Sequence, residues 1–271
     1  MGSFSEEFER IDYPRPPKDS LQISEDFYEH LKTRRSIRSF SSEPVDERIL
    51  INAIRSAGTA PSGANRQPWF FALITDDKMK QKLQLAAEAV EEAFYNQKAT
   101  QEWLDDLKPF GTTASKPYLT EAPALIAVFS RTQSQEPDGT LKPTYYPIES
   151  TGLAVGMLLT ALHHAGLATL THTPRPMFFL NQTLGLDRSY RPFMIIVIGL
   201  PSVPTLVPKI RRKPLHDIFA HFSSENSLQN ICNNQNPLQG EENETNFKID
   251  HCRSSSDGGN GPGGSEALHT D

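Results

Sequence analysis

The segment AGTAPSGANRQPW, residues 57–69, joins a helical pattern to a continuous apolar run. Before it, DERILINAIRSA (46–57) places its apolar residues on one side of a predicted helix, which Gly58 would terminate. After it, WFFALIT (69–75) is typical of a short buried strand. The intervening loop, TAPSGANRQP, is often only a turn. Its small residues could also let backbone amides approach a planar ring closely, because no side chain intervenes.

Outward from this unit, helical and strand patterns are intermixed. Further helices are expected at 23–33, with Ser24 as N-cap, at 78–103, at 147–166 and at 177–185. Further buried strands are expected at 124–130, 168–173 and 193–200. Because helices and strands do not alternate strictly, the fold class is predicted to be α+β. The helix at 147–166 is apolar nearly all round, so it should be buried on most sides, as helices at subunit interfaces often are.

Three parts are expected along the chain: an extension at 1–22, an ordered domain at 23–222 and an acidic tail at 223–271. The tail holds eight acids against Lys248 and Arg253, which accounts for the whole net charge of −6. It has few large apolar residues and is predicted to be disordered. The domain includes a proline-rich arm at 201–222, which is expected to embrace a partner subunit.

Composition also excludes several kinds of function. The domain itself is electrically balanced, which argues against nucleic acid or anionic lipid as partner. No 18-residue apolar window and no secretory signal pattern occur, so a cytoplasmic protein without a membrane span is expected. Both cysteines, Cys232 and Cys252, lie in the tail, so the domain has no disulfide and no cysteine ligand, and no metal site is expected.

Two dense basic clusters stand out in this neutral domain. TRRSIRSF (33–40) places Arg34, Arg35 and Arg38 around Ser36, and KIRRKP (209–214) contains Arg212. Either cluster alone would most often be a solvated turn. Together, fork-shaped guanidiniums and a hydroxyl favour a phosphate ligand. With the loop at 59–68 and the strand end THTP (171–174), they suggest a mononucleotide such as FMN.

At RRSIRSF, IRSAGTAPSGANRQPW, THTP and RRKP the chain resembles the nitroreductase superfamily of FMN flavoproteins, and within it the iodotyrosine deiodinase and halotyrosine dehalogenase branch. The similarity covers about residues 8–222. It implies a nitroreductase-like FMN-binding fold with a mixed sheet flanked by helices. It also implies a homodimer that exchanges arms between subunits and holds FMN at the interface.

The resemblance assigns roles to individual residues. The FMN contacts that it implies come from Arg34, Arg35, Ser36, Arg38, Pro61, Ser62, Gly63, Thr171, His172, Thr173 and Arg212. Thr173 would act in catalysis, because a hydroxyl near N5 of the flavin biases it toward single-electron steps. His172 stands where relatives often have a hydroxyl, which could alter the flavin potential.

VEEAFYNQ (90–97) carries Glu91 and Tyr95 one helical turn apart, which by itself would usually indicate a solvated face. The deiodinase branch has a Glu, a Tyr four residues later and a Lys about twenty further on, which Lys116 matches, in a lid at about 88–118. The resemblance implies that Glu91 binds the ammonium group of a halotyrosine, Lys116 its carboxylate and Tyr95 its ring. The amide of Ala64 would meet the phenolate oxygen.

The function expected from these residues is FMN-dependent reductive dehalogenation of halogenated tyrosines, which releases halide and tyrosine. Electrons would come from NAD(P)H or from a separate reductase. The alternative enzyme is a broad-specificity FMN-dependent NAD(P)H nitroreductase or quinone reductase, which needs none of the three lid residues. A non-catalytic flavin-binding or halotyrosine-sensing protein is the alternative from another class.

Overall fold

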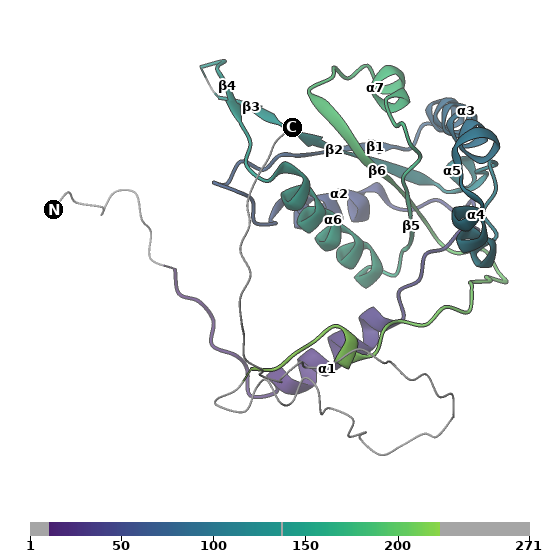
Figure 1. Ribbon diagram of the computed structural model, residues 1–271. Coiled ribbons are helices and arrows are strands. Elements are labelled where there is room, and N and C mark those ends of the chain that lie inside the picture. The colour runs from purple at the N-terminus through teal and green to yellow at the C-terminus, as the bar shows by residue number, and fades with distance from the viewer. Residues whose placement is uncertain (1–10, 137, 223–271) are drawn as a thin grey trace, which may run out of the picture. The chain divides into compact units, whose positions relative to one another are not determined.

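The computed structural model describes residues 11–136 and 138–222. The expected disorder of the tail falls outside these ranges. One compact unit ends at Ile210 and a second begins at Arg211, so the arm expected at 201–222 is divided between them. The first unit is built on a four-stranded sheet in the order β1-β2-β6-β5 (Figure 1). Its strands are β1 (Trp69–Ile74), β2 (Ala124–Arg131), β5 (Ala168–His172) and β6 (Tyr190–Gly199).

All three ladders of this sheet are antiparallel, which corrects the expectation of a mixed sheet. Ala72, Ala127, Ile195 and His172 lie in one row across the four strands. Within the described ranges, parallel pairing is limited to an isolated bridge between Ser36 and Thr169. The apolar runs did not reveal strand direction, because a strand covered on both faces is apolar whichever way its neighbours run.

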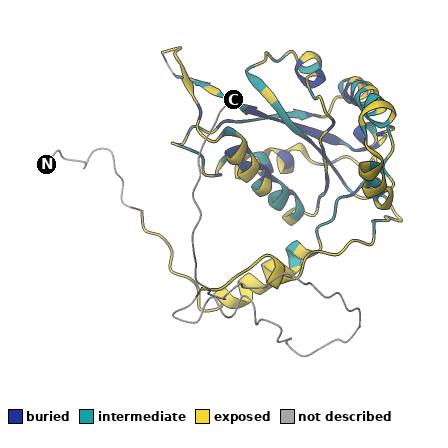
Figure 2. Ribbon diagram, in the orientation of Figure 1, coloured by how far each residue is buried: buried dark blue, intermediate teal, exposed yellow. Residues whose placement is uncertain are grey.

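Helices cover both faces of the sheet, which explains why β1, β2 and most of β6 are apolar. In β2, alternate residues point into different cores. Phe129 packs with the core beneath α3 (Asp77–Ala93), α5 (Tyr118–Glu121) and α7 (Phe179–Leu184). Ile126 packs with the core beneath α2 (Glu47–Gly58) and α6 (Pro147–His164). Figure 2 shows the resulting buried layer in dark blue between these helices.

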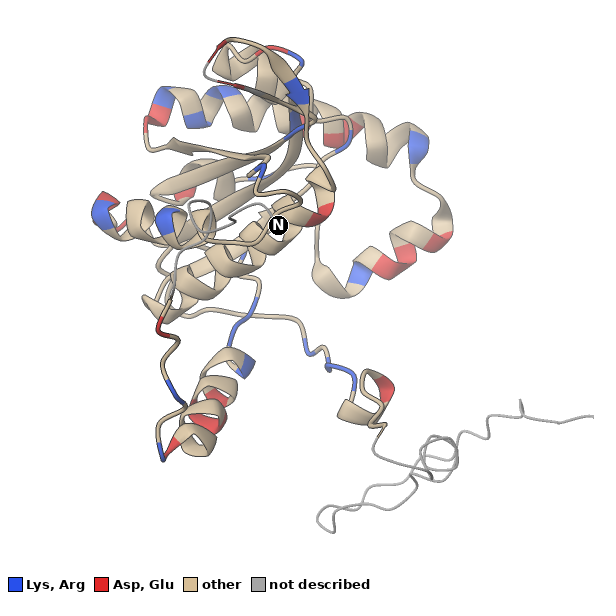
Figure 3. Ribbon diagram, turned by 90° about the vertical axis from the view of Figure 1, so that its left-hand side faces the viewer, with Lys and Arg blue, Asp and Glu red and all other residues tan. Residues whose placement is uncertain are grey.

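The remaining elements are short or lie outside these two layers. They are α1 (Ser20–Lys32), the π-helix η2 (Phe94–Lys98), α4 (Gln101–Leu107), the 3₁₀ helices η3 (Lys108–Phe110) and η4 (Leu215–Asp217), and the hairpin of β3 (Gln133–Gln135) with β4 (Leu141–Pro143). Charged residues of both signs are interspersed over the helices and loops (Figure 3). No helix in residues 11–136 or 138–222 has the length and apolar character needed to cross a bilayer.

Two helix predictions were wrong in detail. Ser24 is not the N-cap of α1, because the helix begins at Ser20 and the Ser24 hydroxyl donates to the Leu21 carbonyl inside it. The single helix expected at 78–103 is interrupted. A π turn follows α3, the backbone at Ala99 is extended, and the Thr100 side chain caps a new helix by accepting from the Trp103 amide.

Helix α6 is buried on one side rather than on most sides. Leu158 and Leu162 are fully buried against the sheet and α2, but Leu153 is 53% exposed and Ile148 is 64% exposed. The sequence associated the apolar character of both sides with a subunit interface, and that part stays a prediction. In the described residues of one chain, the outer side remains open.

Candidate functional site

The arginine cluster lies beside strand β5. Ser36 bridges Thr169, and the Ile37 amide donates to the Thr169 carbonyl at 3.1 Å. The structure therefore brings RRSIRSF beside the strand that ends in THTP. Arg35 donates to the carbonyl of Pro208, which holds its guanidinium toward the segment after β6.

Successive side chains at the end of β5 point to opposite faces of the sheet. Thr171 and Thr173 are exposed, whereas His172 between them is 7% exposed and points to the opposite side. Two hydroxyls are thus open to a ligand next to the arginine segment. The guanidinium carbon of Arg38 lies 5.7 Å from the centre of the Phe110 ring.

Glu91, Tyr95 and Lys116 meet in one place, although Lys116 is far along the chain. The Lys116 ammonium lies 3.0 Å from a Glu91 carboxylate oxygen and 5.5 Å from the centre of the Tyr95 ring. It also donates to the carbonyl of Thr113. The Tyr95 hydroxyl shares a hydrogen bond of 3.0 Å with the Thr112 hydroxyl.

This cluster is more than a solvated face. Lys116 is 4% exposed, and the Glu91 side chain is 15% exposed. A buried ammonium without a partner would be strongly destabilising, so the pairing with Glu91 is what permits its burial. The arrangement offers one positive and one negative group, side by side and next to an aromatic ring, which suits a zwitterion with an aromatic side chain.

Sequence analysis missed Tyr118, which lies behind this cluster and contacts His172. The Tyr118 hydroxyl and His172 Nδ1 are 3.3 Å apart. Burial, reinforced by the positive charge of Lys116, lowers the pKa of His172 from 6.5 to about 3, so the imidazole is neutral. Burial and the negative charge of Glu91 raise the pKa of Tyr118 well above its usual value, so the phenol stays protonated.

The second ring nitrogen of His172 is also informative. His172 Nε2 is buried and has no hydrogen-bond partner among the described residues. Such an atom costs free energy unless a ligand or a water molecule satisfies it. The sequence offers one sign of Tyr118: it follows Lys116 by two residues in TTASKPYL (112–119).

The loop that precedes β1 has an unusual backbone. Ala64, Asn65 and Gln67 all have positive φ, and the Ser62 hydroxyl accepts from the Gln67 amide at 2.9 Å. Gly63 bridges Tyr145, and a Cβ at Gly63 would lie 2.8 Å from the Tyr145 Cβ. The glycine is therefore required by a neighbouring strand segment, a constraint that the sequence alone did not reveal.

This loop and the end of β5 belong to opposite edges of the sheet. The loop leads into β1, and Thr171 to Thr173 end or follow β5, with β2 and β6 between them. Pro61 and Ala64 are exposed, as are Thr171 and Thr173. Arg212 lies in the second unit, so its expected place beside the other arginines stays a prediction. No group of three or more metal-binding side chains occurs in the described ranges.

The chemistry of these donors fits FMN. Guanidiniums and the Ser36 hydroxyl suit a phosphate, and the nearby hydroxyls of Thr171 and Thr173 suit the polar edge of a ring or a ribityl chain. The exposed backbone of the loop at 61–64 suits a flat face. These groups could therefore hold a mononucleotide if both sheet edges reach the same ligand.

Comparison with known proteins identifies the class. A model of the nitroreductase family matches residues 31–200, more than half of the chain, so the chain belongs to the nitroreductase family. Within that family its relatives include iodotyrosine deiodinases. The protein from Haliscomenobacter hydrossis is 43% identical over 197 residues, which cover 73% of this chain and 89% of the relative. The protein from Daphnia pulex is 40% identical over 212 residues, or 78% of this chain and 71% of the relative.

A solved structure supports the same placement. It is that of an oxidized iodotyrosine deiodinase bound to FMN and 3-iodo-L-tyrosine. The match has a TM-score of 0.62 at 31% identity and covers 73% of this chain and all of the other. A BluB-like flavoprotein from Clostridium difficile, at 19% identity and a TM-score of 0.55, shares the fold.

Proposed function

We propose that the chain is an FMN-dependent reductive dehalogenase of halogenated tyrosines. The observation that carries this proposal is the cluster of Glu91, Tyr95 and Lys116, which is assembled and largely buried. A general nitroreductase pocket needs no such pair of opposite charges. The relatives that are named iodotyrosine deiodinases support the same reading.

The cofactor is held by groups from both edges of the sheet. Arg34, Arg35, Ser36, Arg38 and Arg212 would bind the phosphate; Pro61, Ser62, Gly63, Thr171, His172 and Thr173 would lie along the rest of the molecule. FMN, when bound and reduced, supplies the two electrons by which a carbon–halogen bond becomes a carbon–hydrogen bond, with a proton taken up and halide released. Thr173 donates a hydrogen bond at the reacting edge of the ring.

Substrate binding exchanges one set of ionic partners for another. The substrate ammonium takes the place of Lys116 beside Glu91, and the substrate carboxylate takes the place of Glu91 beside Lys116. Each buried charge stays paired throughout, which keeps the cost of desolvation low. Tyr95 packs against the aromatic ring, and the Ala64 amide donates to the phenolate oxygen. The lid then excludes water from the reacting ring.

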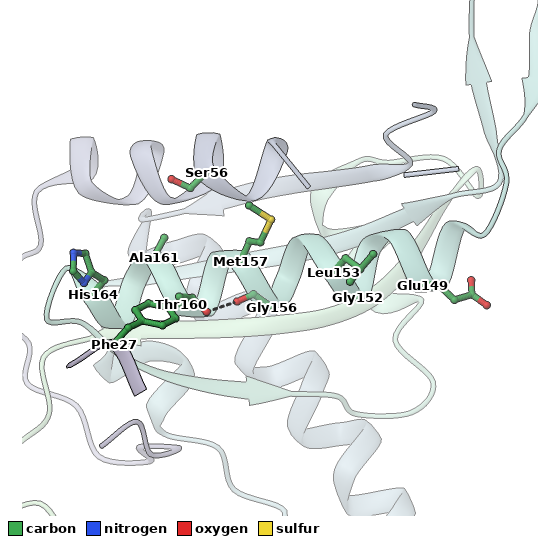
Figure 4. Close-up of a pocket in the computed structure, with 10 residues that line it drawn as sticks. All are labelled: Phe27, Ser56, Glu149, Gly152, Leu153, Gly156, Met157, Thr160, Ala161 and His164. Carbon is green, nitrogen blue, oxygen red and sulfur yellow. Dashed lines mark hydrogen bonds between the residues drawn. The ribbon is translucent and has the colours of Figure 1, made fainter. Parts of the chain in front are cut away.

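The active form is a homodimer. The outer side of α6, with α2 and Phe27 of α1, lines an apolar groove of about 1010 Å³ (Figure 4). Gly152, Gly156 and Ala161 lie along this groove, where small residues allow a helix to approach closely. A second copy seated here is the proposed partner, and the arm at 201–222 would reach across to it. Electrons come from NAD(P)H or a reductase, and the protein is cytoplasmic.

An anaerobic experiment tests the function. The purified protein with FMN is reduced with dithionite and mixed with 3-iodotyrosine, and flavin reoxidation is followed together with iodide release. Both are expected at equal rates. Reoxidation without iodide, together with NADPH-driven turnover of quinones or nitroaromatics, would support the broad-specificity reductase instead. A protein that binds iodotyrosine and reoxidises with neither substrate would be a sensor.

Substitutions in the lid test the assigned roles. Glu91→Gln and Lys116→Ala should each weaken iodotyrosine binding by about 2 kcal/mol or more, because one charge of a desolvated pair is left alone. FMN should remain bound in both. Glu92→Gln is the matched control, since Glu92 is the next residue along the chain and is exposed. Unchanged affinity in the first two variants would contradict the assignment.

A further inference from the structure

A row of polar contacts joins one face of the lid helix to the segment at 112–120. The row, here called the lid seam, involves side chains spaced by one helical turn or nearly so. In this row, Thr120 donates to Gln84, and Ser115 and the Lys116 amide donate to Glu88. The Lys116 ammonium pairs with Glu91, and Thr112 shares a hydrogen bond with Tyr95. Two of these members, Glu91 and Tyr95, belong to the substrate cluster.

Glu88 makes the densest set of contacts in the lid seam. One carboxylate oxygen, Oε1, accepts from the Lys116 amide at 2.6 Å, the Gln84 side-chain amide at 3.0 Å and the Ser115 hydroxyl at 3.2 Å. Burial alone would raise the pKa of Glu88, but these three hydrogen bonds outweigh it and lower the pKa below the usual value. Glu88 is therefore ionised and firmly held.

Lys116 is thus held at two points by two different carboxylates. Its backbone amide is bound by Glu88, and its side-chain ammonium is bound by Glu91. A substrate carboxylate needs only the ammonium, so it displaces Glu91 and leaves the Glu88 contact intact. The two contacts consequently have different roles, one permanent and one exchangeable.

We propose that Glu88 is a positioning residue that anchors the backbone of the lid at Lys116 and thereby aims the ammonium at the substrate carboxylate. The proposal rests on the proposed function in so far as Lys116 binds substrate. The anchoring itself requires no ligand. Without Glu88, the 112–116 segment would lose two charge-assisted hydrogen bonds to α3, and the Lys116 backbone would no longer be fixed beside Glu91.

The test uses the FMN-loaded protein and three variants. Glu88→Ala removes the anchor, Glu88→Gln keeps an amide oxygen that can accept from Lys116 and Ser115 but lacks the charge, and Glu92→Ala is the exposed neighbouring control. The first measurement is the rate of trypsin cleavage within the lid, at the exposed Lys98, without substrate. Glu88→Ala should be cleaved about tenfold faster than wild type, Glu88→Gln at an intermediate rate, and Glu92→Ala at the wild-type rate.

The second measurement is turnover of 3-iodotyrosine. In Glu88→Ala, KM should rise by about tenfold and kcat should change much less, because the anchor affects binding geometry and not the reacting ring. FMN affinity should be unchanged. Wild-type cleavage rates in both Glu88 variants would overturn the anchor, whether or not the protein dehalogenates. If lid cleavage rises but the wild type releases no iodide, the anchor stands and the proposed function fails. Should Glu88→Ala not fold, Glu88→Gln against Glu92→Ala decides the same question.

Discussion

Replacing His172 by threonine is expected to reduce the loss of stability that follows acidification. In the folded chain the pKa of His172 is lowered to about 3, against 6.5 for an exposed imidazole. The unfolded chain therefore binds a proton at this site first as the pH falls, which favours unfolding. The part of the free energy of unfolding that depends on neutral His172 is fully present above about pH 6.5 and is lost progressively below it, down to about pH 3.

The size of the effect follows from that difference in pKa. Each pH unit below the unfolded pKa costs about 1.4 kcal/mol until the folded imidazole itself is protonated. Acidification from about pH 8 to about pH 5 should thus remove about 2 kcal/mol from the free energy of unfolding through His172 alone. The His172→Thr variant should therefore lose about 2 kcal/mol less than wild type over the same pH change, whatever its free energy of unfolding is at about pH 8.

Urea unfolding followed by circular dichroism at the two pH values provides the measurement. Protein and FMN concentrations must be the same throughout, since ligand binding and association both shift apparent stability. His221→Gln serves as control because His221 is exposed, and it should lose as much stability as wild type. Equal losses in wild type and His172→Thr would refute the assignment of a buried neutral imidazole at this position.

Two further predictions concern the loop before β1 and the outer side of α6. Gly63→Ala should destabilise the fold by about 1–3 kcal/mol in urea unfolding, because the new Cβ would meet Tyr145. Gly58→Ala, where a Cβ has open space, should be neutral or stabilising by up to about 1 kcal/mol; similar losses in both would contradict the crowding. Leu153→Glu should weaken dimerisation at least about tenfold in analytical ultracentrifugation. Leu85→Glu, on the exposed side of α3, should not, and an intact Leu153→Glu dimer would exclude this interface.

The elements that pattern alone could predict are those with a strong, uniform environment. β2 and β6 are apolar because cores lie on both faces, and α2 shows a clear apolar stripe with Asp46 as its cap. Strand direction could not be predicted, because burial on both faces removes the alternation that would distinguish one arrangement from another. The interruption of the lid helix was also invisible, since residues 78–103 contain no glycine or proline.

Aromatic packing accompanies the interruption. In the π turn, Phe94 packs edge-on against its neighbour Tyr95 at 5.5 Å and against Trp103 at 4.8 Å, as measured between ring centres. The contact with Trp103 is made across the break and is not encoded in local helix propensity. Sequence analysis could still place Glu91 and Tyr95 together, because the turn that separates them stays helical in form.

The candidate site was predictable where spacing or resemblance identified a residue and not where a backbone group was the partner. Glu91, Tyr95 and Lys116 do meet, and RRSIRSF does lie beside β5. Glu88 was missed because its main partner is the amide of Lys116, 28 residues away, and a backbone amide leaves no signal in the sequence. Tyr118 was missed because its partner, His172, lies on a distant strand.

The ion pair between Glu91 and Lys116 also bears on how an anion leaves. With a carboxylate oxygen 3.0 Å away, the Lys116 ammonium is matched before an amino acid enters and again after it departs. A halide released nearby carries one negative charge and brings no positive group that could pair with Glu91. It could bind the Lys116 ammonium only by leaving the Glu91 carboxylate buried without a partner. Added iodide or bromide should accordingly be a poor inhibitor, and the lid retains molecules that bring both charges while releasing those that bring one.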